Sequence, residues 1–147
     1  MLNTLQIGAA GVLLVQYRLL LMGIESAPMT TDTGIDLVAY SNKSQTAVTI
    51  QVKTCLQSKP AGGKGQSALD WWLRESSPAE LVALVDLSTE KVWLFEHSIF
   101  VEKCQQNPSG RLHLYFYTDP AYKARAGSHE KEFVDFRIKK AAPILLG

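Results

Sequence analysis

The most regular pattern along the chain is an alternation of apolar and polar residues over positions 47–54. Valine or isoleucine occupies the even positions from 48 to 52, and polar residues occupy the odd ones from 49 to 53. Because successive side chains of a β-strand point to opposite faces, the pattern predicts a strand with one apolar and one polar face. It places Gln51 and Lys53 side by side on the polar face.

Similar patterns divide the rest of the chain into strands and helices, with turn residues between them. The polar stretch 41–45 predicts a hairpin loop, and small residues at 8–11 would let another element pack closely on the first helix. The expected elements in chain order are a helix over 6–22, a short edge strand within 25–33, strands over 36–40 and 47–54, a short helix over 68–75, strands over 81–87 and 91–95, a helix over 97–106, a strand over 111–117 and a helix over 130–139.

The apolar stretch 7–24 has to be distinguished from a membrane span or a signal peptide. Gln16, Tyr17 and Arg18 interrupt its middle, where a charge inside a bilayer is costly, and no Lys or Arg precedes it. We therefore expect a largely buried amphipathic helix of a soluble protein, with no membrane partner, that ends at Gly23.

Two other expected helices carry signals of their own. Trp71 and Trp72 are neighbours in the helix over 68–75, and neighbours on a helix point about 100° apart. One of the two is therefore expected in the core and the other partly exposed. Ser128 is the expected N-cap of the last helix, whose acidic first turn and basic end match the helix dipole.

These elements predict a single mixed α/β or α+β domain over residues 1–147, with a central mixed sheet flanked by helices. The hydrophobic fraction of 46% and the charged fraction of 20% are typical of a globular protein and exclude a disordered one. The formal net charge is only +1, so a nucleic-acid partner would require positive charge concentrated on one face. Cys55 and Cys104 form no metal-binding motif and are expected as thiols in a reducing cytoplasm.

The residues with the clearest chemical potential are Asp36, Gln51 and Lys53. If the strands that carry them form a hairpin, a carboxylate, an amide oxygen and an ammonium group converge at one sheet edge. Mg²⁺ takes oxygen ligands, usually one or two carboxylates together with substrate phosphate and water. A lysine beside the ion can orient the attacking water and offset phosphate charge, which suits phosphodiester hydrolysis.

The segments around these residues resemble a known family. Gly34-Ile35-Asp36 followed by Gln51-Val52-Lys53 is similar to the PD-(D/E)xK motif of restriction-endonuclease-like nucleases. The order of a Gly-containing first helix, "DTGIDLVAY", "TIQVKT" and "LVALVDLSTEKVWLFE" also resembles that family. The resemblance is closest to the branch similar to a cyanobacterial group I intron homing endonuclease.

This resemblance implies a restriction-endonuclease-like core and a metal-dependent DNA endonuclease. It implies that Asp36 and Gln51 hold Mg²⁺ or Mn²⁺ and that Lys53 serves the attacking water. Because a double-strand cut needs two active centres, it also implies a homodimer or a higher homo-oligomer.

The sequence departs from the family pattern at two metal-binding positions. Gln51 replaces a carboxylate, and Val12 occupies a position in the first helix where many relatives have Glu. Asp36 is then the one firmly placed carboxylate, although Asp32 and Glu25 of the preceding loop could contribute. We therefore expect weak or conditional metal binding, and the alternative is a catalytically decayed nuclease-fold module that binds DNA or a protein partner.

The Gly- and Lys-rich loop over 58–67 does not have the spacing of a nucleotide-binding phosphate loop, so no nucleotide cofactor is expected. It directly follows the strand that carries Lys53. Lys59 and Lys64 are therefore expected to contact the DNA backbone as positioning residues.

The three histidines, His97, His113 and His129, are scattered along the sequence, and we interpret none of them as a metal ligand. Tyr115 and Tyr117 share a predicted strand face with His113. Partly exposed aromatic residues on such a face are candidates for a dimer interface.

Overall fold

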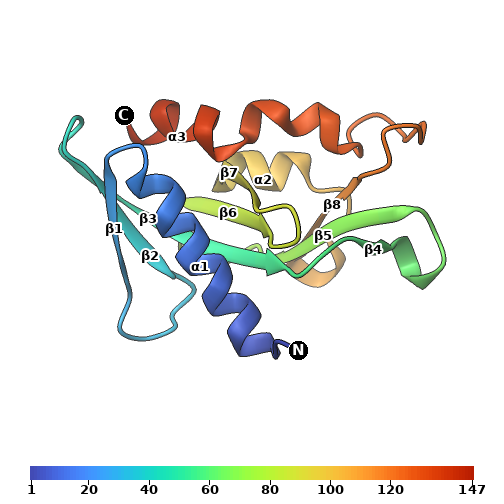
Figure 1. Ribbon diagram of the computed structural model, residues 1–147, viewed down its shortest axis with the longest axis horizontal. Coiled ribbons are helices and arrows are strands. Elements are labelled where there is room, and N and C mark those ends of the chain that lie inside the picture. Colours follow the sequence, from blue (N-terminus) through green and yellow to red (C-terminus); the bar gives the residue numbers. More distant parts are fainter.

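The computed structural model describes residues 1–147 and has a five-stranded mixed sheet at its centre (Figure 1). Neighbouring strands are antiparallel except for β3 and β6, which pair in parallel in the middle of the sheet. The strands in spatial order are β1 (Ile24–Pro28), β2 (Leu37–Ser41), β3 (Thr46–Cys55), β6 (Leu81–Asp86) and β7 (Lys91–Glu96).

A second sheet of three antiparallel strands lies beside the first. Its strands are β4 (Lys59–Pro60), β5 (Ser67–Arg74) and β8 (Arg111–Tyr117). The helices are α1 (Thr4–Leu20), α2 (His97–Lys103) and α3 (Ile138–Leu146), and the 3₁₀ segments are η1 (Ala61–Gly63), η2 (Pro108–Gly110) and η3 (Glu130–Phe136).

Two apolar clusters cover the two faces of the five-stranded sheet. On one face, side chains of the sheet pack against α1 and α3. On the other face, β6 and β7 pack against β5, β8, α2 and η3. Strand β6 contributes to both clusters, and all of its residues are buried. This layered arrangement confirms the predicted mixed α/β class with a central mixed sheet flanked by helices.

Helix α1 approaches β3 closely at Gly11, as the run of small residues predicted. A Cβ atom added to Gly11 would lie 1.8 Å from Oγ1 of Thr54, whereas one added to Gly8 would meet nothing within 4 Å. Gly11 is therefore the residue that lets α1 lie directly against the Thr54 side chain of β3.

The expectation that the first helix is largely buried is wrong. Only Gly11, Val15 and Leu19 of α1 are buried, and they form one narrow stripe. Val12 and Leu14 beside this stripe are partly buried against the same cluster, whereas the outer face of α1 is exposed. Its exposed large apolar side chains are Leu5, Leu13, Tyr17 and Leu20.

The short helix expected over 68–75 is also wrong, because this segment forms strand β5. From Leu69 onward its buried residues alternate, with Trp71 at 2% exposure and Trp72 half-buried on the opposite face. The prediction of one core and one partly exposed tryptophan is correct. The two side chains point to opposite sides because successive residues of a strand alternate, and not because of the turn of a helix. The sequence of this segment is compatible with a helix or a strand, and pairing with β8 over seven residues makes it a strand.

The helix expected over 130–139 begins at Glu130 as predicted, but it is the 3₁₀ segment η3, which ends at Phe136 and has a different cap. His129 is the cap of η3, and its ring accepts a hydrogen bond from the backbone N–H of Lys131. The Ser128 hydroxyl instead donates to the carbonyl of Arg125. The chain then leaves the helical conformation at Arg137 and starts α3 at the next residue.

The other predicted elements are present, with small differences in length. The strands over 36–40, 47–54, 81–87, 91–95 and 111–117 correspond to β2, β3, β6, β7 and β8, and the edge strand is β1. Helix α2 is shorter than expected and ends before Cys104. Part of the loop over 58–67 is ordered as β4 and η1. None of the helices is long and apolar enough to cross a membrane.

The contact at Gly11 predicts a clear difference between two glycine substitutions in the same helix. Gly11→Ala should lower the free energy of unfolding by about 1–3 kcal/mol, because its methyl group would overlap Thr54. Gly8→Ala should raise it by about 0.5–1 kcal/mol, because alanine has the higher helix propensity and the space is open. Urea unfolding of both variants measures this, and equal effects would contradict the close approach of α1 to β3.

Candidate functional site

A tight turn at Gly34 places Asp36 directly before β2. Gly34 has φ +88°, a conformation that favours glycine, and a Cβ atom there would lie 2.9 Å from Cδ of Pro78. The backbone N–H of Asp36 then donates to the carbonyl of Ile50, with N and O 2.9 Å apart. Asp36 is thereby fixed next to β3 before the strand pairing of β2 begins.

The carboxylate of Asp36 is tied to the backbone of β3. Its Oδ2 accepts a hydrogen bond of 2.7 Å from the N–H of Val52. Partial burial raises the pKa of Asp36 above its usual value, and the nearby charge of Asp32 also raises it. The hydrogen bond from Val52 and the ammonium of Lys53 act in the opposite direction. The carboxylate therefore lies in a partly desolvated position between an anionic and a cationic neighbour.

Gln51 and Lys53 lie on the same face of β3, as predicted from the alternation. They pair with Val82 and Leu84 of β6, so they lie on the side of the sheet that also holds β5 and β8. Both are half-buried. Oε1 of Gln51 accepts a short hydrogen bond from the hydroxyl of Ser77, which orients the amide. A second lone pair of this oxygen remains for another partner.

A cleft of about 510 Å³ opens in front of these two side chains. Asp32 and the turn at Gly34 form one wall, next to Asp36, and the end of β5 with the loop after it forms another. The lining residues are Asp32, Thr33, Gly34, Gln51, Lys53, Arg74, Ser76, Ser77 and Pro78. This lining has no large apolar side chain, so the cleft suits a polar or charged ligand.

Other residues named from the sequence lie in different places. Glu25 is exposed on β1 and does not line the cleft, whereas Asp32 does. Val12 packs against the apolar cluster under α1, on the opposite face of the sheet from Gln51. Lys59 lines a neighbouring hollow together with Lys53.

Arg74, Ser76 and Ser77 were not identified from the sequence, because the segment that leads to them was predicted to be a helix. A strand with a two-residue period would have placed Arg74 on the same face as Trp72. The position of Ser77 opposite Gln51 depends on the loop after β5 and has no local signal in the sequence.

Neither histidine nor cysteine chemistry contributes to the cleft. Nowhere in the molecule do three or more His, Cys, Asp or Glu side chains gather in a way that could hold a metal ion. Lys64 is exposed at the end of η1. Cys55 and Cys104 are free thiols, and burial raises the pKa of Cys55 to about 11, so it is protonated at neutral pH.

Comparison with solved structures shows that the mixed α/β architecture is shared with a known protein. The chain is similar to a solved bacterial homing endonuclease, I-Ssp6803I, with a TM-score of 0.66 and 18% sequence identity. The match covers 99% of this chain and 93% of the other. No protein-family model matches the sequence. No curated protein matches it either.

The raised pKa of Asp36 predicts a pH-dependent effect of Asp36→Asn. The native state holds the Asp36 proton more tightly than the unfolded chain, so the stability linked to this group is present at low pH and lost as pH rises through the folded pKa. Asn at this position still accepts the bond from Val52 but carries no charge. Asp36→Asn should therefore be more stable than the parent protein at neutral pH, and the difference should vanish in acid. Urea unfolding over a pH series measures it, and a variant less stable at neutral pH would contradict the desolvation of Asp36.

Proposed function

We propose that the protein is a metal-dependent DNA endonuclease that hydrolyses phosphodiester bonds. The observation that carries this proposal is that Gln51 and Lys53 line one polar cleft, while Asp36 is hydrogen-bonded to the same strand between them, at Val52. The fold is shared with a bacterial homing endonuclease. The motif resemblance to PD-(D/E)xK nucleases supports the same assignment.

The donor set fits a hard divalent cation such as Mg²⁺ or Mn²⁺. Asp36 and Gln51 would hold the ion, and Asp32, which lines the cleft, is the candidate for a second carboxylate. A bound ion would offset the repulsion between these two carboxylates. Such an ion supplies Lewis-acid stabilisation of phosphate charge and a more acidic water.

In this proposal Lys53 acts on the substrate, which is supported by its not being held in an ion pair. No carboxylate oxygen lies within 4.0 Å of its ammonium nitrogen. A half-buried, unpaired ammonium in a polar cleft can offset the charge of a phosphate and orient the attacking water. Ser77 is a positioning residue in this scheme, because its hydroxyl fixes the amide of Gln51.

DNA is the proposed partner, and two copies of the chain would supply the two centres that a double-strand cut requires. We propose that this assembly is a homodimer or a higher homo-oligomer. The two free thiols fit a reducing compartment such as the cytoplasm.

A second candidate function is a nuclease-fold module that binds DNA but no longer cleaves it. The observation that favours it is the amide of Gln51 at a position where a carboxylate would bind metal more strongly. The two functions differ in one property, because only the enzyme converts DNA to product.

Plasmid cleavage in Mg²⁺ and in Mn²⁺ tests the enzymatic proposal. The parent protein should nick or linearise the plasmid, and Lys53→Ala should lower the rate by at least about 10²-fold, since it removes the group that serves the attacking water. Lys139→Ala is the matched control, because Lys139 is exposed on α3 and does not line the cleft. Cleavage that persists in Lys53→Ala would refute the role of Lys53. Absence of cleavage in either metal, with DNA binding retained, would favour the binding module.

A further inference from the structure

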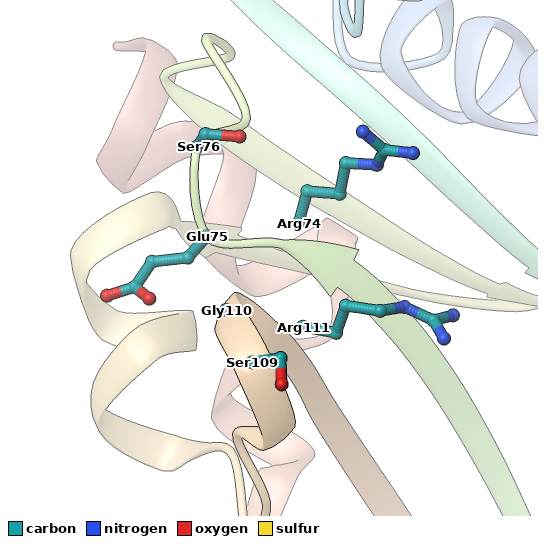
Figure 2. Close-up of a pocket in the computed structure, with 6 residues that line it drawn as sticks. All are labelled: Arg74, Glu75, Ser76, Ser109, Gly110 and Arg111. Atoms are coloured by element: carbon teal, nitrogen blue, oxygen red, sulfur yellow. The ribbon is translucent and has the colours of Figure 1, made fainter.

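Two arginines lie directly opposite each other at the end of the second sheet. Arg74 of β5 pairs in register with Arg111 of β8, and both are exposed. Directly paired residues of two strands share a face of the sheet. Figure 2 shows the two side chains extending in the same direction, while the carboxylate of Glu75 points the opposite way.

This pair has no anionic partner within the chain. No carboxylate oxygen lies within 4.0 Å of either guanidinium group. Like charges directly opposite each other on neighbouring strands destabilise a sheet. The arrangement is therefore unfavourable for the free protein and becomes favourable when an anion lies between the two groups.

The guanidinium of Arg111 is held in place by aromatic contacts. Its Cζ lies 4.8 Å from the ring centroid of Trp72, a cation–π distance. Trp72 itself stacks on His113, with ring centroids 4.0 Å apart and an angle of 3° between the planes. His113 is fixed in turn by Asp70, whose Oδ2 lies 2.8 Å from Nε2 of the ring. These contacts limit the entropy that Arg111 would lose on binding a ligand.

The arginine pair opens into a hollow of about 610 Å³, which Glu75, Ser76, Ser109 and Gly110 also line. Arg74 lines both this hollow and the cleft of Lys53. Lys53 in turn shares a further hollow with Lys59. Lys59, Lys53, Arg74 and Arg111 therefore line a series of hollows in which neighbours share a cation, and each hollow also has one acidic residue: Asp70, Asp32 or Glu75.

We propose that Arg74 and Arg111 bind a backbone phosphate of the DNA strand that enters the Lys53 cleft. The planar guanidinium group matches the geometry of phosphate oxygens and binds them through two parallel hydrogen bonds. The contact positions the strand and carries no sequence information. The choice of DNA as the source of the phosphate rests on the proposed function, whereas the anion site itself rests on the unpaired arginines.

The salt dependence of DNA binding tests this site separately from cleavage. A fluorescently labelled duplex is titrated without divalent metal, so that no cleavage occurs, at several salt concentrations. Arg74→Gln/Arg111→Gln should weaken binding about 10- to 100-fold and reduce the slope of log affinity against log salt by about two, because two phosphate contacts are lost. Lys43→Gln/Lys139→Gln removes two exposed charges far from the cleft and should leave the slope unchanged.

Several results would overturn the proposal. These are a slope equal to that of the parent protein, an equal loss in the lysine control, or no salt-dependent DNA binding by the parent protein. The proposal would also be overturned if Arg74→Gln/Arg111→Gln lost the binding of inorganic phosphate but bound DNA as the parent protein does. The two arginines would then be a site for free phosphate. Arg74→Gln alone leaves the stacking of Trp72 intact, and its slope should fall by about one even if the double variant fails to fold.

The outcome is distinguishable from failure of the endonuclease proposal. Arginine-dependent DNA binding by a protein that never cleaves DNA would support the phosphate site and refute only the enzyme. Cleavage that proceeds normally in Arg74→Gln/Arg111→Gln, with unchanged binding, would refute only the phosphate site.

Discussion

The register of β3 between β2 and β6 is the constraint on which the rest of the structure depends. Its even-numbered side chains from 48 to 52 enter or flank the cluster under α1, and the odd-numbered Gln51 and Lys53 face the cleft. A slip of one residue would exchange the two faces and bury an ammonium group among apolar side chains. The close approach of α1 at Gly11 and the bond from Val52 to Asp36 both hold this register. The register of β3 therefore determines both the packing of the core and the geometry of the site.

The electrostatics of the site follow from the same placement. Asp36 receives a backbone hydrogen bond but is partly desolvated and lies near Asp32, so its charge is poorly compensated in the free protein. Arg74 lines the same cleft, and it pairs with Arg111, so uncompensated positive charge lies at the end of β5 and the start of β8. A cation beside Asp36 and a phosphate beside the arginines would offset both, so metal and DNA are expected to favour each other's binding.

The sequence predicted the part of the site that a single strand encodes. Gln51 and Lys53 were found because the two-residue period of β3 is unbroken, and Asp36 because it directly precedes the neighbouring strand. Strand β5 was missed because the adjacent Trp71 and Trp72 obscure its alternation. The pairing of Arg74 with Arg111 depends on the register between strands far apart in sequence, which no local pattern shows. The break at Arg137 likewise depends on how η3 and α3 pack against the sheet.

Binding of a divalent ion together with DNA by Asp36 and its neighbours is tested most directly by titration of Mn²⁺ with and without a DNA duplex. The electron paramagnetic resonance signal of the free ion reports how much is bound. We predict weak binding by the protein alone, tighter binding when DNA supplies a phosphate ligand, and loss of both in Asp36→Asn. Tight Mn²⁺ binding that Asp36→Asn leaves unchanged, or no uptake even with DNA present, would contradict this prediction.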